Sequence, residues 1–251
     1  MSATMRMAIM GGAVGCLLLT LFILKPGWKR PGEPDTLYLW DKAHRRLVPV
    51  LLYSENIDSG KNRKVVILAH GLGIRNSDYA YISSHLAAKG FIVASVQYGL
   101  PGDKEPDRSG NIYEALKPVW DQSDQSILFV IHYLKNKYPN LDFQNLTLIG
   151  HSRGGDVLAL FAQEYPEMVS KLISLDNGHM PLPRTIKPQV FSLRAYNTTP
   201  DKGVLPTPEE QKEFNITIVE LQDISHIEMC FGTEAQKEEM IRYIDGFLNK
   251  E

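Results

Sequence analysis

The sequence predicts an α/β domain with a mostly parallel central sheet and helices on both of its faces. Three observations support this fold class. Apolar runs typical of buried strands alternate along the chain with segments of helical periodicity. Two further strand-like segments precede this alternation. One apolar run passes directly into a helix through a Gly-x-Ser-x-Gly sequence. A chain of 251 residues is long enough for one such domain with its own core.

Hydrophobic periodicity and turn residues divide the domain into elements. Alternating or continuous apolar positions predict strands, which span residues 36–40, 46–53, 64–70, 91–96, 146–149, 171–176, 189–193 and 216–221. Helical spacing of apolar residues predicts helices, which span residues 76–89, 123–137, 156–162, 209–213 and 233–250. A polar stretch rich in Gly and Pro over residues 99–111 predicts a long loop, and such loops are often functional.

The composition of the chain excludes some classes of function but does not identify one. Hydrophobic residues make up 43% of the chain and charged residues 22%, with a formal net charge of −2, as in an ordinary globular protein. There is no basic stripe with interleaved aromatic residues, so we do not expect nucleic acid as a partner. The two cysteines are Cys16 and Cys230, and no Cys or His cluster has the spacing of a zinc site. No metal or cofactor is implied.

An uncharged apolar segment occupies residues 7–24. Its length is at the lower limit for a membrane span. A cleaved signal peptide ends in a small-x-small site, and none lies between residues 24 and 31, so we favour an uncleaved anchor. We expect residues 1–30 to be an anchor or signal segment with a linker, and residues 31–251 to be the folded domain. The protein would then be membrane-anchored or exported, with the periplasmic or extracytoplasmic side favoured.

The Gly-x-Ser-x-Gly sequence places Ser152 at the tip of a sharp turn between a strand and a helix. Gly150 and Gly154 are expected where the backbones of the strand and the helix pass too close for larger side chains. The turn strains the backbone of the serine and presents its Oγ to solvent. Ser152 is therefore the candidate nucleophile.

A serine alcohol needs a base within hydrogen-bond reach and a third group that orients the base. His226 follows the last predicted strand, which is where this arrangement places its base. His151 precedes the nucleophile and is expected to point elsewhere. His70 is expected to support a neighbouring turn, and His179 to be exposed in a loop.

Two aspartates are candidates for the acid. Asp176 ends the strand that follows the helix after the Gly-x-Ser-x-Gly turn, and Asp201 lies in the loop after the next strand. Both positions can project a carboxylate beyond the C-terminal edge of the sheet, and spacing slightly favours Asp201. The residues alone leave Asp176 and Asp201 as alternatives.

The developing oxyanion of an acyl-transfer reaction needs backbone donors that are held in place before the reaction. The candidates are the N–H groups of Arg153, directly after the nucleophile, and of Leu72, between two glycines in the turn at residues 70–73. The charged side chain of Arg153 leaves the substrate class open.

Taken together, these motifs resemble the α/β-hydrolase superfamily over residues 36–250. Within it, the chain is most similar to the group of platelet-activating-factor acetylhydrolase, chlorophyllase and dienelactone hydrolase-like proteins. The similarity lies in residues 65–73, 86–94 and 149–155, and in Leu175-Asp176 followed by Met180-Pro181-Leu182. In the acetylhydrolases the last of these blocks carries the catalytic acid. The resemblance therefore implies the α/β-hydrolase fold for residues 31–251 and favours Asp176 over Asp201.

The sequence predicts a serine hydrolase that cleaves carboxylic esters or thioesters of small or lipid-like molecules through an acyl-enzyme. A loop over residues 99–117, with Tyr98, Tyr113 and Trp120 nearby, is expected to form the wall of the acyl or leaving group, and these aromatic residues can equally be ordinary core. The alternative is an inactive α/β-hydrolase scaffold that acts as a binding protein tethered to a membrane through residues 7–24.

Overall fold

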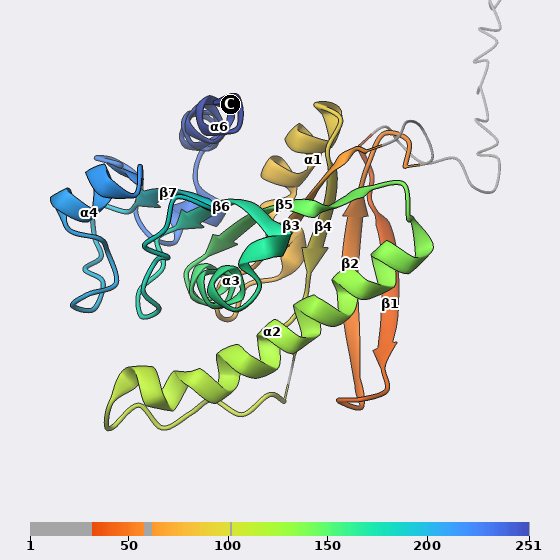
Figure 1. Cartoon of the computed structure of the whole chain (residues 1–251), viewed down its shortest axis with the longest axis horizontal. Coiled ribbons are helices and arrows are strands. Elements are labelled where there is room, and N and C mark those ends of the chain that lie inside the picture. The colour runs from red at the N-terminus through yellow and green to blue at the C-terminus, as the bar shows by residue number, and fades with distance from the viewer. Residues whose placement is uncertain (1–31, 58–61, 101, 251) are drawn as a thin grey trace, which may run out of the picture. The chain divides into compact units, whose positions relative to one another are not determined.

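The computed structural model describes residues 32–57, 62–100 and 102–250. Within them lies an eight-stranded sheet with the order β1-β2-β4-β3-β5-β6-β7-β8 (Figure 1). Its strands are β1 (Asp35–Asp41), β2 (Arg46–Tyr53), β3 (Lys64–Ala69), β4 (Ile92–Val96), β5 (Asp142–His151), β6 (Val169–Leu175), β7 (Gln189–Arg194) and β8 (Thr217–Glu220). The pairs β1–β2 and β2–β4 are antiparallel and the other five are parallel. The predicted fold class is confirmed.

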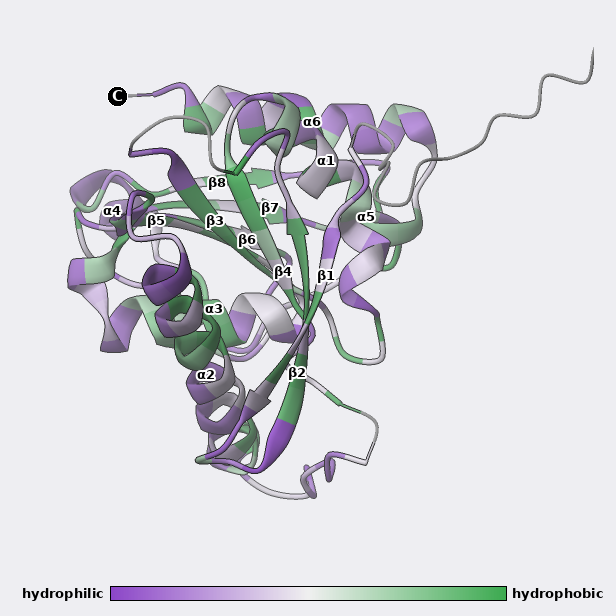
Figure 2. Cartoon of the chain, turned by 90° about the vertical axis from the view of Figure 1, so that its right-hand side faces the viewer, coloured by the Kyte–Doolittle hydropathy of each residue, from purple (hydrophilic) through white to green (hydrophobic). Residues whose placement is uncertain are grey.

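Helices cover both faces of the sheet. One face carries α2 (Ile112–Lys137) and α3 (Arg153–Glu164), and the other carries α1 (Ala80–Ala88) and α6 (Glu234–Leu248) (Figures 1 and 2). The remaining helical elements are α4 (Pro208–Glu213), α5 (Glu228–Phe231) and the short 3-10 turns η1 (Asn76–Tyr79) and η2 (Pro166–Met168). Two separate apolar cores, one on each face, bury most residues of the central strands. The sheet is therefore a rigid platform for the loops at its edge.

Helix α2 is longer than the sequence pattern predicts. It begins at Ile112 rather than at residue 123, and it contains Pro118. Asn111 caps it, because the side-chain oxygen of Asn111 accepts hydrogen bonds from the next backbone N–H groups. Proline normally interrupts a helix, but Leu116 and Trp120 lie on either side of it in the core, and their burial stabilises the first turns. The loop before α2 therefore ends at residue 111 and does not reach residue 117.

The C-terminal ends of the parallel strands bring distant parts of the chain together. Strand β3 leads into the turn at residues 70–73, β5 into Ser152, and β6 into Asp176. All of these residues lie at one edge of the sheet, where open α/β sheets bind their ligands.

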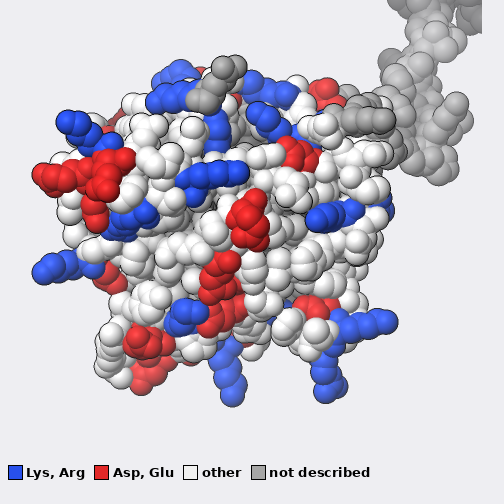
Figure 3. All heavy atoms as spheres, in the orientation of Figure 1, with Lys and Arg blue, Asp and Glu red and all other residues white. Residues whose placement is uncertain are grey.

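The outer surface of the domain carries charges of both signs. On the face that Figure 3 shows, acidic and basic side chains are interspersed. In residues 32–57, 62–100 and 102–250, no helix has the length and apolar character of a membrane span. The predicted anchor at residues 7–24 and most of its linker lie outside the described residues, so the division at residue 30 stays a prediction.

Candidate active site

Ser152 stands at the turn between β5 and α3, with φ of 53° and ψ of −122°. A non-glycine residue seldom adopts a positive φ, and such strain persists only where the surroundings enforce it. The neighbouring backbones do so here. A Cβ on Gly150 would lie 2.3 Å from the carbonyl oxygen of Gly154, and a Cβ on Gly154 would lie 2.3 Å from that of Ala69. The close approach that the sequence predicts is present.

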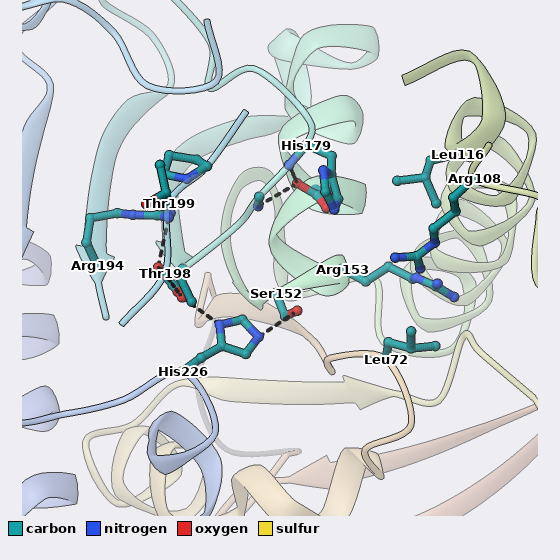
Figure 4. Close-up of a pocket in the computed structure, with 14 residues that line it drawn as sticks. Leu72, Arg108, Leu116, Ser152, Arg153, His179, Arg194, Thr198, Thr199 and His226 are labelled. Carbon is teal, nitrogen blue, oxygen red and sulfur yellow. Dashed lines mark hydrogen bonds and ion pairs between the residues drawn. The ribbon is translucent and has the colours of Figure 1, made fainter. Parts of the chain in front are cut away.

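The structure brings His226 to Ser152. The Nε2 atom of His226 lies 3.0 Å from the Oγ of Ser152, and its Nδ1 atom lies 2.5 Å from the Oδ2 of Asp176 (Figure 4). A carboxylate can only accept, so the Nδ1 of His226 carries a proton and its Nε2 is free to accept the serine proton. The three side chains thus have the geometry of a nucleophile, a base and an orienting acid.

Asp176 is an ionised carboxylate in a fully buried position. Its oxygens accept from Arg194, which is 2.8 Å away, from the hydroxyl of Thr198 and from the backbone N–H of Ala195. Burial by itself raises the pKa of Asp176, but the His226 hydrogen bond, Arg194 and the smaller contacts outweigh it and hold the pKa below its usual value. The acid therefore stays charged when it faces His226.

Asp201 has a different partner. Its carboxylate lies 2.8 Å from the Nδ1 of His179, and its backbone N–H donates to the carbonyl of Gly178. Asp201 is partly exposed, and His179 lines the cavity beside Ser152. Of the two candidate acids, the geometry joins Asp176 to His226 and places Asp201 at the rim of the site. His179 lies in a loop, as expected, but it is partly buried and lines the cavity.

The two expected oxyanion donors flank Ser152. Leu72 and Arg153 both line the cavity that contains the nucleophile (Figure 4). Their backbone N–H groups form no hydrogen bond with any of the residues that the structure describes. Since Arg153 opens α3, its N–H also lies at the positive end of the helix dipole. Both N–H groups are therefore available to a ligand.

His70 fixes the turn that carries Leu72. Its Nδ1 atom donates to the carbonyl of Gly71 over 2.7 Å, while its Nε2 accepts from the side-chain amide of Gln97 over 2.9 Å. The Gly71 carbonyl and the Leu72 N–H belong to one planar peptide, so holding the carbonyl also fixes the direction of the N–H. Burial lowers the pKa of His70 to about 4, and the imidazole remains neutral. The supporting position expected for His70 is what the structure shows.

Three residues at the site were not singled out in the sequence. Arg194 and Thr198 bind Asp176. Asp156 accepts from the backbone N–H groups of residues 178–180 over 2.9–3.2 Å and so holds the loop after Asp176. Two signals in the sequence could have indicated Arg194 and Asp156. Arg194 is a charged residue at the end of the apolar strand β7, and Asp156 is a charged residue in the first turn of the apolar helix α3. No local pattern distinguishes Thr198.

Two cavities meet at the oxyanion residues. The first, of about 230 Å³, contains Ser152 and His226, and the second, of about 310 Å³, lies on the side of Tyr98 and Gln97. Leu72 and Arg153 line both cavities. The guanidinium of Arg153 forms a bidentate pair with Glu105 at 2.7 and 2.6 Å, and this pair ties the loop before α2 to the site.

The aromatic wall expected from the sequence is only partly present. Tyr98 lines the second cavity and stacks on His70 at 4.4 Å between ring centroids. Trp120 is fully buried in the core, and Tyr113 packs edge-on against it. Trp120 is an ordinary core residue, the alternative that the sequence left open, because its side chain is fully buried, and Tyr113 packs against it. Arg108 and Leu116 line the first cavity instead.

The sheet order, the elbow and the position of the candidate triad define the chain as a protein of the α/β-hydrolase fold. The family model of chlorophyllase matches residues 45–200, which is more than half of the chain. The chain therefore belongs to the chlorophyllase family, as the sequence resemblance indicated. The match includes Ser152 and Asp176 and ends before His226.

Solved structures agree with this fold. An arylesterase has a TM-score of 0.62 at 14% identity, over 88% of this chain and 85% of its own. An esterase of the Planctomycetes species Thermogutta terrifontis has a TM-score of 0.61 at 11% identity, over 86% and 91%. A dienelactone hydrolase of Anabaena variabilis has a TM-score of 0.57 at 14% identity, over 84% and 95%.

Curated relatives match over shorter stretches. An uncharacterized protein of Mycobacterium tuberculosis is 26% identical over 113 residues, which cover 45% of this chain and 29% of the relative. A protein of Oryza sativa subsp. japonica, named probable 1-acylglycerol-3-phosphate O-acyltransferase, is 28% identical over 125 residues, or 50% and 28%. The chain thus spans less than a third of the length of these relatives.

Proposed function

We propose that the protein is a serine hydrolase that cleaves carboxylic esters or thioesters through an acyl-enzyme. The observation that carries this proposal is the continuous hydrogen-bonded series Ser152–His226–Asp176, at 3.0 and 2.5 Å, beside two backbone N–H groups that have no partner among the described residues. Each part has one role in acyl transfer, and the parts occur together. Membership of the chlorophyllase family and the esterase names of the structural neighbours support the same reaction class.

In the first step the Oγ of Ser152 attacks the substrate carbonyl, and its proton passes to the Nε2 of His226. Asp176 stabilises the resulting imidazolium through Nδ1–H. The carbonyl oxygen becomes negatively charged and accepts from the N–H groups of Leu72 and Arg153, which together account for several kcal/mol of the barrier reduction. His226 then gives its proton to the departing alcohol or thiol. Water repeats the sequence on the acyl-enzyme and releases the acid.

The cavities favour an ester with one small substituent at the reacting carbonyl. The space around Ser152, about 230 Å³, is smaller than the usual range for a drug-sized ligand. The second cavity, of about 310 Å³, adds room on the far side of Leu72 and Arg153. We propose that the acyl group and the leaving group divide between these two spaces.

A fluorophosphonate probe tests the nucleophile directly. We expect the folded wild-type protein to be labelled at Ser152, and the Ser152→Ala variant to remain unlabelled. A panel of nitrophenyl esters and matched thioesters with acyl chains of increasing length should then show turnover that falls as the chain outgrows the first cavity. A folded wild-type protein that neither reacts with the probe nor turns over any ester would contradict the hydrolase proposal. That result would favour the inactive binding scaffold.

A further inference from the structure

A buried series of hydrogen bonds connects the oxyanion turn to the loop of the base. It starts at the backbone N–H of Gly71, which donates to the hydroxyl of Tyr79 over 3.1 Å. The same hydroxyl lies 2.6 Å from the Nδ1 of His151. On the other side of the ring, the Nε2 of His151 lies 3.0 Å from the backbone carbonyl oxygen of His226. Tyr79 and His151 are each 1% exposed.

The direction of every bond in this series follows from its ends. The carbonyl of His226 can only accept, so the Nε2 of His151 carries the proton. The Nδ1 of a neutral imidazole is then an acceptor, and the hydroxyl of Tyr79 must donate to it. The oxygen of Tyr79 remains free to accept from Gly71. Burial, reinforced by the neighbouring His226, lowers the pKa of His151 to about 3, so the ring stays neutral and keeps this single tautomer.

One end of the series lies one peptide before Leu72, and the other end is the backbone carbonyl of His226 itself. Gly71 immediately precedes Leu72, which lines the cavity that contains Ser152. His226 carries the base, and its own backbone N–H donates to the side chain of Asn197 over 2.8 Å. The backbone of His226 is therefore held on both sides: His151 binds its carbonyl, and Asn197 binds its N–H.

His151 packs closely against both the oxyanion turn and His226. A Cβ on Gly71 would lie 3.0 Å from the Nδ1 of His151 and 3.4 Å from the Cβ of Ser152. The rings of His151 and His226 are 4.7 Å apart between centroids. A shift of His151 would therefore be transmitted to the turn and to the base together.

We propose that Tyr79 and His151 are positioning residues that hold the oxyanion turn and the base at a fixed separation around Ser152. This inference rests on the hydrolase function proposed above and deepens it. His151 was expected to point away from the chemistry, and it does not touch the reacting atoms. Its role is exerted through the backbone of His226 and, by way of Tyr79, through that of Gly71. Misplacement of reacting groups by about 1 Å can cost about a hundredfold in rate.

The two amide substitutions of His151 form a matched pair. His151→Gln places an amide nitrogen near the position of Nε2 and keeps a donor for the carbonyl of His226. His151→Asn is too short to reach that carbonyl. We expect kcat of the Asn variant to fall about 10- to 100-fold with little change in KM, and the Gln variant to recover most of the loss. A purely structural role would instead make activity follow the unfolding temperature of each variant.

Tyr79→Phe removes one oxygen from the other half of the series and serves as a second test if His151→Asn does not fold. We expect the same type of loss, mainly in kcat. Tyr81→Phe is the control, because it removes a hydroxyl that donates over 2.7 Å to the carbonyl of Met229, outside the site, and it should leave kcat unchanged.

The rate of labelling by the fluorophosphonate probe and the turnover of a short nitrophenyl ester are the two readouts. An active wild type, together with Tyr79→Phe and a folded His151→Asn variant that keep its kcat, would overturn the inference and leave the hydrolase function standing. An unlabelled and inactive wild type would overturn the function itself, and the positioning role with it.

Discussion

At the scale of single residues, the acid is decided by the surroundings of its carboxylate. Asp176 directly follows β6 with φ of 57°, and this left-handed backbone is unusual for a residue other than glycine. Its charge is buried but matched by His226, Arg194 and Thr198. Asp201 has one partner, His179, near the surface. We infer that only Asp176 orients the base.

Substitution of each aspartate by asparagine tests this assignment. Asp176→Asn should lower kcat by about four orders of magnitude, because an amide cannot hold the imidazole in the same tautomer or stabilise its positive charge. Asp201→Asn should stay within about threefold of the wild type, since an exposed ion pair contributes little. The measurement is steady-state turnover of a short nitrophenyl ester.

Asp176→Asn also leaves the buried Arg194 without its carboxylate. Because an unpaired buried charge is costly, we expect a lower unfolding temperature for this variant. Turnover must therefore be compared well below that temperature. If Asp201→Asn caused the larger loss of kcat under these conditions, the assignment of the acid would be wrong.

At the scale of elements, α2 contains a buried carboxylate that the proposed reaction does not use. Asp124 is fully buried, and neither of its carboxylate oxygens has a hydrogen-bond partner among the residues that the structure describes. Burial raises the pKa of Asp124 to about 7, and the nearby carboxylates of Glu164 and Asp121 add to the effect, while Lys117 and the nearby hydroxyl of Tyr165 oppose it. Below about pH 7 the helix therefore holds this group in its neutral, protonated form.

The raised pKa predicts how stability depends on pH. Asp124 in the unfolded chain ionises near its ordinary value, about 3.9, whereas in the folded state it ionises at about 7. The folded state therefore binds more protons between these values, and its free energy of unfolding falls as the pH rises from about 4 to about 7. The stabilisation that protonated Asp124 contributes is fully present below the pKa of the unfolded chain and is lost above the pKa of the folded state.

Asp124→Asn removes the pH-dependent fall in the free energy of unfolding without changing the shape of the side chain. At about pH 8 we expect the variant to be more stable than the wild type by on the order of 1–3 kcal/mol, with a much smaller difference at about pH 5. Denaturant unfolding at both pH values measures the difference. Asp121→Asn, on the exposed side of the same helix, is the control and should change little. An equal difference for Asp124→Asn at both pH values would contradict the assignment.

At the scale of the whole molecule, the location of the protein is still a prediction. The apolar residues 7–24 predict membrane association, and the folded domain beginning near residue 31 would then lie beside the membrane. Leu18→Arg combined with Phe22→Arg places two charges in this segment, and charges at the centre of a span oppose insertion.

We expect the full-length wild-type chain to sediment with membranes and to resist extraction by high salt, and the doubly substituted chain to remain in the supernatant. The ester turnover of the two proteins should be the same in detergent, because the substitutions lie outside the domain that carries Ser152. A wild-type chain that stays in the supernatant would contradict the anchor.

The sequence by itself determined the fold class, the nucleophile elbow and the late histidine. These features depend on residues that are close in the sequence. The alternation of apolar strands and helices follows the order of residues, and a Gly-x-Ser-x-Gly turn needs only its own glycines to form. Helix α2 shows the limit of local patterns. The spacing of apolar residues predicted a helix that begins at residue 123, but Leu116 and Trp120 are buried against the rest of the domain and the helix begins at Ile112.

Only the tertiary structure showed that Asp176, and not Asp201, contacts His226, and assigned a place to His151. Both aspartates follow strands at the same edge of the sheet, so their positions in the chain are nearly equivalent. The difference lies in partners that are distant in sequence: His226 and Arg194 for Asp176, and His179 for Asp201. Likewise, His151 gains its contacts from Tyr79 and from the backbone of His226. Hydrogen bonds act over about 3 Å in space, and the fold alone determines which residues come within that distance.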